Sequence, residues 1–343
     1  MTRMKHKFFS LTLALAFTLQ LLQLPPVAEA AFIPITAPTA LLLDNTTNQI
    51  LYAKTPHLRR PPASTTKLLT AIVALKLKVP DTVVTIPSAA TSMPPSKIYL
   101  KTGERYRLRD LLHALLMNSA NDVAAAIAIS TAGSTAEFAR EMNATAYQLG
   151  CRDSHFVNPS GLPDRRQYST AYDMALIMRE VQKYPILVQA LKTRTATIRS
   201  AAGRRVPLKN HNKMLWRDPR EVLGKTGWTR SARHCFVGQI TVDGKRVFVA
   251  MLGSHRLWRD LQTLVNYQFG LPWIKKQVSK IAARAHHKEI QLALKRSGDY
   301  RGKIDGQLGV FSKRAIRRFQ KRHGLGVDGV AGPQTWNVLK RYL

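Results

Sequence analysis

Short apolar runs near both ends of one long segment predict paired β-strands. Runs 40–44 and 50–53 flank a polar, turn-rich stretch and therefore predict a β-hairpin. Runs 236–242 and 245–252 are joined by an Asp-Gly dipeptide, which is a strong hairpin turn signal. We expect one hairpin near each end of this segment.

Apolar residues between these hairpins recur with the spacing of one helical face. The predicted helices span 65–76, 108–117, 122–130, 135–149 and 171–182. Because strands at both ends enclose a run of helices, we expect an α+β domain. The two hairpins should form one antiparallel sheet.

The first residues predict a secretory signal peptide, residues 1–30, rather than folded structure. A basic start precedes the apolar stretch 8–24, and the small-residue site Ala28-Glu29-Ala30 follows. Two glutamines interrupt this stretch, which is shorter than the roughly 20 apolar residues of a membrane span. We expect cleavage after Ala30, no transmembrane anchor afterwards, and an exported protein of the periplasm or cell wall.

The chain is strongly basic, with a formal net charge of +33. Removal of residues 1–30 takes away three basic residues and one acidic residue, which leaves +31. Such a charge attracts polyanions over a long range, and salt weakens the attraction. For an exported protein the expected partner is an anionic cell-wall polymer or a membrane surface, not nucleic acid.

The length of 343 residues exceeds the roughly 100 to 200 residues of one ordinary domain, so we expect more than one domain. The composition changes after residue 273, where a basic stretch without Pro or Gly begins. We assign 31–273 to a first domain, 274–287 to a basic linker with some helical tendency, and 288–343 to a second domain.

Cys151 and Cys235 are the only cysteines, and both lie in apolar surroundings. A disulfide between them is open in an oxidising compartment, although two buried free thiols are favoured. Neither has a CxxC partner or a His/Cys cluster, so no structural zinc is expected.

The first candidate motif is Ser64-Thr65-Thr66-Lys67 at the start of a predicted helix. An offset of three residues places Ser64 and Lys67 on one helical face. A serine hydroxyl needs a nearby base, and a lysine with a depressed pKa can serve. Taken alone, so common a pattern is better explained by an N-capping serine followed by a solvated lysine.

The second motif is Ser119-Ala120-Asn121, directly after a predicted helix. Ser119 can pass a proton between the lysine and a leaving amine. Asn121 can donate to a substrate carbonyl and hold Lys67 in place. Alone, the motif is only a plausible turn.

The third motif is Lys225-Thr226-Gly227, followed by Trp228. It offers a cation, a hydroxyl and room for close backbone approach, which suits the terminal carboxylate of a peptide. Alone, it is only a basic strand end.

Together, the order SxxK, SxN and KTG is typical of penicillin-binding proteins and class A β-lactamases. The chain resembles the D-alanyl-D-alanine carboxypeptidases, the low-molecular-weight penicillin-binding proteins of peptidase family S11, from about residue 39 to 271. The segment 158–163, which reads Asn-Pro-Ser-Gly-Leu-Pro, is similar to a further segment of that family. The resemblance implies a β-lactamase/transpeptidase-like fold.

The resemblance also implies a role for each motif residue. Ser64 is the acylated nucleophile, Lys67 the general base and Ser119 the proton relay. The implied substrate-binding residues are Asn121, Lys225, Thr226, Gly227 and Trp228, with an oxyanion hole made by the backbone N–H groups of Ser64 and Trp228. The substrates would be peptidoglycan stem peptides, with β-lactams as covalent inhibitors at Ser64. No metal or organic cofactor is implied.

The resemblance leaves one site residue open. An arginine after the last strand often assists carboxylate binding in relatives, and Arg256 and Arg259 compete for that place. The family usually continues with a small β-rich domain and an amphipathic anchor helix, whereas this sequence continues with a different domain.

Residues 288–343 resemble the all-α, three-helix peptidoglycan-binding domain of type 1. The resemblance is carried by Phe319-Gln320, Gly324-Leu325, Asp328 to Gly332 and Thr335-Trp336. We expect the Asp-Gly turns and Phe319 to be structural. A solvated cationic face is expected at Arg314, Arg317, Arg318, Lys321 and Arg322. Which residues contact glycan stays open.

Four other functions share some of these features. A class A β-lactamase needs a deacylating glutamate, which has no counterpart in the 158–164 segment. A D,D-endopeptidase or a transpeptidase would use the same residues on crosslinks. A non-catalytic wall-binding protein would need only the C-terminal domain, and the three intact motifs disfavour it.

Overall fold

The computed structural model of the chain describes residues 33–218, 220–269 and 272–343. The predicted signal peptide therefore lies outside the described residues. Among the helices of the described part, none is both long and apolar enough to cross a membrane.

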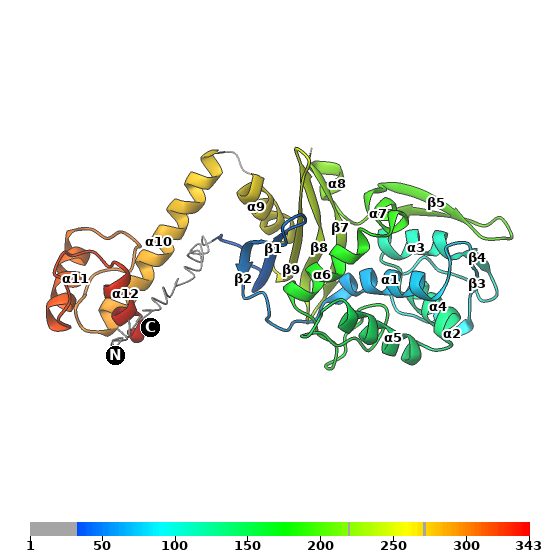
Figure 1. Cartoon of the computed structure of the whole chain (residues 1–343), viewed down its shortest axis with the longest axis horizontal. Helices are drawn as coiled ribbons and strands as arrows, with labels where there is room; N and C mark the ends of the chain where they lie inside the picture. The colour runs from blue at the N-terminus through cyan, green and yellow to red at the C-terminus, as the bar shows by residue number, and fades with distance from the viewer. Residues whose placement is uncertain (1–32, 219, 270–271) are drawn as a thin grey trace, which may run out of the picture. The chain divides into compact units, whose positions relative to one another are not determined.

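A five-stranded antiparallel sheet forms the centre of the first domain (Figure 1). Its order is β2-β1-β9-β8-β7. The strands are β1 Thr39–Asp44, β2 Ile50–Lys54, β7 Glu221–Thr229, β8 Arg233–Val242 and β9 Lys245–Ser254. Both predicted hairpins form, and β1 pairs with β9. The prediction that they share one sheet is confirmed.

The five predicted helices are confirmed, with ends that shift by up to a few residues. They are α1 Lys67–Leu77, α3 Leu108–Met117, α4 Asn121–Ala132, α5 Thr135–Gln148 and α6 Ala171–Val181. The prediction was wrong on one detail, because the residues before Lys67 form the 3-10 helix η1, Ala63–Thr66. Ser64 thus lies in a tight turn that leads into α1.

Smaller elements that the sequence pattern did not reveal complete the domain. The helices are α2 Ser88–Thr91, α7 Pro185–Lys192, α8 Met214–Arg217 and α9 Leu257–Phe269. Two further hairpins pair β3 Val83–Thr85 with β4 Arg105–Arg107, and β5 Thr195–Arg199 with β6 Arg205–Lys209.

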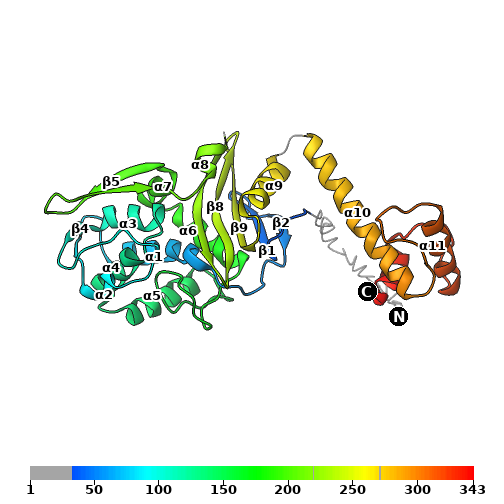
Figure 2. The same cartoon turned by 180° about the vertical axis from the view of Figure 1, so that it is seen from behind.

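Both faces of the sheet are buried, because successive side chains of a strand point to opposite faces. In β1, Leu41 and Leu43 belong to one apolar cluster with residues of α1, α3 and α6, whereas Ala40 and Leu42 belong to a second cluster with residues of α9. Figure 2 shows the sheet between α9 and the larger helical layer. Two apolar clusters therefore hold the sheet rigid where its strands carry site residues.

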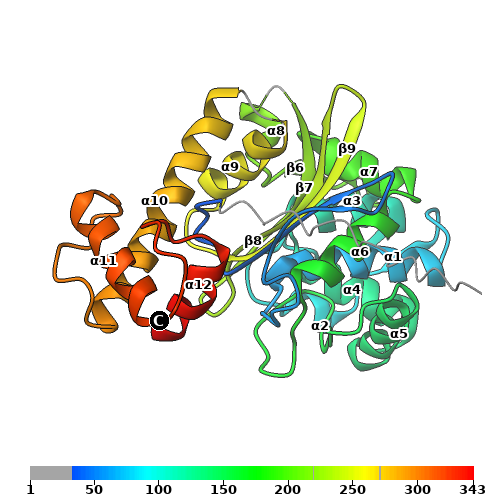
Figure 3. The same ribbon diagram turned by 60° about the vertical axis from the view of Figure 1, so that its left-hand side comes forward.

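Three helices and a final 3-10 turn make up the C-terminal part (Figure 3). They are α10 Pro272–Arg296, α11 Val310–Arg322, α12 Pro333–Leu339 and η2 Lys340–Tyr342. The predicted linker, 274–287, lies inside α10, in keeping with its lack of Pro and Gly. Domain boundaries here stay predictions.

The core of the C-terminal part forms around Phe319, which is fully buried as predicted. Ile290, Leu294 and Ile316 pack with it. The side chains predicted to form a cationic face are exposed: Arg314, Arg317, Arg318, Lys321 and Arg322.

Two buried glutamines hold the two Asp-Gly turns in the same way. Gln320 Nε2 donates to Asp328 Oδ1 at 2.7 Å and to the Val330 carbonyl at 3.0 Å, while its Oε1 accepts from Gly329 N. Gln291 makes the equivalent contacts with the turn 305–307. The Asp-Gly turns therefore serve the fold, as expected, and the domain contains an internal repeat.

Both cysteines are buried free thiols, as favoured from the sequence. Burial raises the pKa of each thiol to about 12. Cys151 Sγ lies 3.5 Å from the Asp173 carbonyl, and Cys235 Sγ lies 3.8 Å from the Pro61 carbonyl.

Candidate active site

The three sequence motifs meet at one open cleft of about 810 Å³ in the first domain. Ser64 comes from η1, the second motif comes from the turn between α3 and α4, and the third comes from β7. The motif residues that line the cleft are Ser64, Ser119, Asn121, Thr226, Gly227 and Trp228. The fold thus brings motifs that are far apart in the sequence to the same cleft.

Lys67 lies fully buried beneath the cleft and contacts the candidate nucleophile. Its Nζ is 3.1 Å from Ser64 Oγ, 2.8 Å from Asn121 Oδ1 and 2.6 Å from the Ser160 carbonyl oxygen. Burial, and then the positive charge of Lys225, hold the pKa of Lys67 well below its ordinary value, against the opposing charge of Asp122.

The contacts of Lys67 orient a neutral amine toward Ser64. The Asn121 and Ser160 oxygens can only accept, so they take both N–H groups of a neutral amine. The nitrogen lone pair is then left for the Ser64 hydroxyl, which donates to it. This is the arrangement that a general base needs.

The segment 158–163 forms one wall of this site. Asn158 Oδ1 accepts hydrogen bonds from the backbone N–H groups of Ser160, Gly161 and Leu162, which fixes the loop. Gly161 has φ +81°, and a Cβ there would lie 1.9 Å from the Ala63 carbonyl oxygen. Only glycine allows this loop to lie against the residue before Ser64 and present a carbonyl to Lys67.

The turn between α3 and α4 holds Ser119 in a strained conformation. Ser119 has φ +60°, which a non-glycine residue rarely adopts, and its side chain is largely buried at the cleft. Asn121 Nδ2 donates to the Pro94 carbonyl at 3.0 Å, and Asn121 N donates to the Ser96 carbonyl at 2.7 Å. These contacts fix the amide whose oxygen holds Lys67.

Strand β7 brings the third motif against η1. A Cβ on Gly227 would lie 2.8 Å from Ser64 N, so glycine permits the strand to approach the nucleophile. Lys225 is buried below the cleft, and its Nζ donates to the Thr226 carbonyl at 2.8 Å. Burial lowers the pKa of Lys225 to about 7. Trp228 is 59% exposed at the cleft.

Several cleft residues were missed from the sequence, among them the cationic or titratable His211, Lys213 and Arg230. The surrounding protein, and then the charges of Lys225 and Lys67, lower the pKa of His211 to about 4. Arg256 and Arg259, the two arginines that competed for a carboxylate role, are exposed but are not among the residues that line the cleft.

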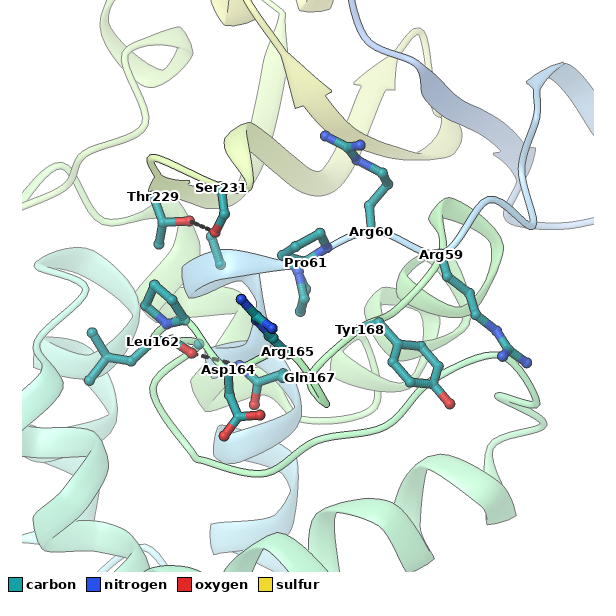
Figure 4. A pocket seen from close by; sticks show the side chains of 14 residues that line it. Arg59, Arg60, Pro61, Leu162, Asp164, Arg165, Gln167, Tyr168, Thr229 and Ser231 are labelled. Atoms are coloured by element: carbon teal, nitrogen blue, oxygen red, sulfur yellow. Dashed lines mark hydrogen bonds between the residues drawn. The ribbon is translucent and has the colours of Figure 1, made fainter.

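A smaller pocket of about 450 Å³ lies beside the cleft (Figure 4). It shares Gly161, Leu162 and Thr229 with the cleft. Figure 4 shows Asp164 and Tyr168 among the side chains that line it. Ser64 is not among its lining residues, so the chemistry of the three motifs belongs to the larger cleft.

The fold and the site define a serine acyl-transfer enzyme of the penicillin-binding type. The family model for D-alanyl-D-alanine carboxypeptidase, peptidase S11, matches residues 26–256, and the model for a peptidoglycan binding domain matches residues 285–339. The chain belongs to the D-alanyl-D-alanine carboxypeptidase family S11, as the sequence motifs indicated.

Individual relatives agree with this assignment. The chain is 32% identical to D-alanyl-D-alanine carboxypeptidase DacF of Bacillus subtilis, over 64% of this chain and 57% of the relative. It is 33% identical to a D-alanyl-D-alanine endopeptidase of Escherichia coli, over 74% of this chain and 84% of the relative. The chain thus spans little more than half of DacF but most of the endopeptidase.

A solved structure confirms the fold. The crystal structure of a D-alanyl-D-alanine carboxypeptidase from Mycobacterium tuberculosis superposes with a TM-score of 0.67 at 32% identity. The match covers 71% of this chain and 95% of that one. The predicted β-lactamase/transpeptidase-like α+β fold is therefore confirmed.

Proposed function

We propose that this chain is a penicillin-sensitive serine D-Ala-D-Ala carboxypeptidase that removes the terminal D-Ala from peptidoglycan pentapeptides. The observation that carries the proposal is the contact of 3.1 Å between Ser64 Oγ and the buried Lys67 Nζ at the floor of an open cleft. The S11 family assignment supports the substrate class.

Acylation begins when the Ser64 hydroxyl gives its proton to the neutral amine of Lys67. The oxygen attacks the carbonyl carbon of the penultimate D-Ala, and negative charge develops on the carbonyl oxygen. The backbone N–H groups of Ser64 and Trp228 are the proposed donors to that oxygen. Such preorganised donors supply a large share of the rate enhancement in acyl transfer.

The tetrahedral intermediate collapses as the C–N bond to the terminal D-Ala breaks. The leaving amine takes a proton that Lys67 releases through Ser119, which lines the cleft. The product is an ester on Ser64. Water then attacks the ester by the reverse proton path and frees the shortened peptide. A β-lactam would form the same ester.

The terminal carboxylate of the substrate is assigned to the β7 side of the cleft. Thr226 and Thr229 line that side, with the exposed Arg230 next in sequence. Lys225 is buried beneath them, so it acts through its positive charge and its hold on the Thr226 carbonyl. An anionic terminus is favoured in this cationic part of the cleft.

The protein is also proposed to work outside the cytoplasmic membrane, on the cell wall. Residues 1–30 would direct export, and residues 288–343 would bind peptidoglycan, as the match to a peptidoglycan binding domain suggests. The exposed cations of α11 suit contact with an anionic wall polymer. A sacculus pull-down that compares the full chain with one ending at residue 273 tests this part.

The experiment that tests the activity compares wild type with Ser64→Ala. Purified pentapeptide is incubated with each protein, and the products are analysed by mass spectrometry. We expect loss of one D-Ala with wild type only. Labelling with a fluorescent penicillin should likewise require Ser64. An unlabelled wild type that leaves pentapeptide intact would favour a non-catalytic wall-binding role.

A further inference from the structure

His211 is exposed in the cleft but has no part in the serine chemistry. It lines the same space as Ser119 and Thr226. Within the part of the chain that the structure describes, neither ring nitrogen of His211 is hydrogen bonded to another residue. In its neutral form the ring offers one N–H donor and one acceptor, and both are free for a ligand.

Two buried asparagines fix the backbone on either side of His211. Asn210 Nδ2 donates to the Thr193 carbonyl at 3.0 Å, and Asn210 Oδ1 accepts from Asn212 N at 2.9 Å. Asn212 Nδ2 donates to the Val222 carbonyl at 2.8 Å. Both asparagines are buried, and satisfied polar contacts of this kind make a loop rigid. The imidazole therefore projects from a loop that is held in place before any ligand binds.

The same loop is bonded to the two elements that receive the leaving D-Ala. His211 N donates to the Met117 carbonyl at 3.2 Å, close in sequence to Ser119, the proposed proton donor to the leaving amine. The Asn212 amide is bonded to β7, the strand that carries Thr226 and the assigned carboxylate side. The amine and the carboxylate of D-Ala are attached to the same carbon atom, so His211 lies on the side of the cleft where both groups are expected.

We propose that His211 binds the terminal carboxylate of the substrate, and that it thereby favours peptides that end in a free carboxylate. This inference rests on the proposed serine chemistry at Ser64. The imidazole N–H donates to one carboxylate oxygen, and the Thr226 hydroxyl is available to the other. Arg256 and Arg259 do not line the cleft, so the donor comes from this loop rather than from the residues after the last strand.

A histidine suits this place because the site already contains two buried amines. The surrounding protein, and then the charges of Lys225 and Lys67, hold the pKa of His211 at about 4. The ring is therefore neutral near neutral pH and donates a hydrogen bond without adding positive charge beside the general base. A lysine or arginine at the same place would add that charge and would lower the pKa of Lys67 further.

Two substitutions of His211 separate its contact with the substrate from its place in the fold. His211→Ala removes the donor, whereas His211→Gln keeps a side-chain N–H. The matched control is His113→Ala, because His113 lies on α3 and is not among the residues that line the cleft. Lys213→Met tests the rival donor, since Lys213 is an exposed cation of the same cleft.

Each protein is assayed on pentapeptide and on the same peptide with a C-terminal amide. Acylation is measured with benzylpenicillin and with its methyl ester. Only the first member of each pair carries the carboxylate. We expect His211→Ala to lower kcat/KM about tenfold for that member, with a higher KM for pentapeptide and little change for the neutral member. His211→Gln should retain most of the preference for the carboxylate, and His113→Ala and Lys213→Met should retain all of it.

Two results would overturn the inference without touching the proposed function. One is a preference for the carboxylate that His211→Ala leaves unchanged, whether or not both rates fall; a lost preference in Lys213→Met would then assign the carboxylate to that lysine. The other is a loss with His211→Gln as large as that with His211→Ala, because the N–H donor would then not matter. A wild type that neither acylates with benzylpenicillin nor trims pentapeptide would instead reject the proposed function itself.

Discussion

The buried amines of Lys67 and Lys225 belong to one site, and the positive charge of Lys225 helps to hold the pKa of Lys67 below its ordinary value. With a pKa of about 7, Lys225 is itself charged in acidic solution. Its charge therefore opposes protonation of Lys67 in acidic solution, up to the pKa of about 7 at which Lys225 itself loses the charge.

Lys225→Met tests this coupling. Loss of the neighbouring charge favours the ammonium form of Lys67, so the pKa of Lys67 rises. The acidic limb of the pH profile for penicillin acylation should move to higher pH. Stopped-flow acylation across a pH series measures the shift. Lys101→Met, which removes an exposed charge that does not shift the pKa of Lys67, is the control, and an equal profile for both variants would contradict the coupling.

Gly161→Ala tests the contact between the 158–163 segment and η1. Its Cβ would meet the Ala63 carbonyl oxygen at 1.9 Å, so the loop must move and the Ser160 carbonyl must leave Lys67. Gly103→Ala is a matched control, because Gly103 has the same φ of +81° with nothing within 4 Å.

We expect Gly103→Ala to cost about 1 kcal/mol of unfolding free energy, the usual range for a strained left-handed residue. Gly161→Ala should cost several times that and slow acylation as well. Thermal unfolding and acylation rates measure both effects. If the two variants lose similar amounts of stability and activity, Gly161 would be needed only for its positive φ and not for its close contact with Ala63.

Gln320→Leu tests the contacts that hold the Asp-Gly turns. The change leaves the buried Gly329 N without its acceptor, which costs about 1–3 kcal/mol for an unsatisfied buried group, and it also removes the donor to the exposed Asp328 carboxylate. The C-terminal part should unfold at a lower temperature, while penicillin acylation is unchanged. Calorimetry of the full chain, with the exposed Gln334→Leu as control, detects the difference.

The thiols of Cys151 and Cys235 should resist modification in the folded protein. Both are buried, and a pKa of about 12 leaves almost no thiolate in mildly alkaline solution. A chromogenic disulfide reagent should therefore react slowly with native protein and quickly in denaturant. Fast reaction of either thiol before unfolding would show that its pocket opens readily.

Helices and hairpins were predictable where one periodicity dominates a segment. Strand β7 was not predictable in this way, because two glycines interrupt its apolar pattern. These glycines are required by close contacts with other elements of the fold. Gly224 faces Gly238 across the sheet, and Gly227 faces η1, each at distances that exclude a side chain. The need for these glycines depends on residues distant in the sequence, so the local sequence pattern does not reveal it.

The catalytic residues were predictable because their motifs coincide in order, whereas the wall of the site was not. His211 lies in a segment without a local signal and reaches the cleft through a backbone contact with Met117. The role of the Ser160 carbonyl was equally hidden, since any residue type supplies a carbonyl. Placement of these groups depends on tertiary contacts alone.

The pairing of β1 with β9 has a consequence for how the chain folds. Thr39 pairs with Leu252, so the strand made first must wait for one of the last strands of its domain before the sheet can close. Such a topology has a high contact order and folds slowly. During synthesis the β1–β2 hairpin lacks its partner strand until β9 is made. A chain that stops before β9 would therefore expose the edge of β1 to pairing with other molecules.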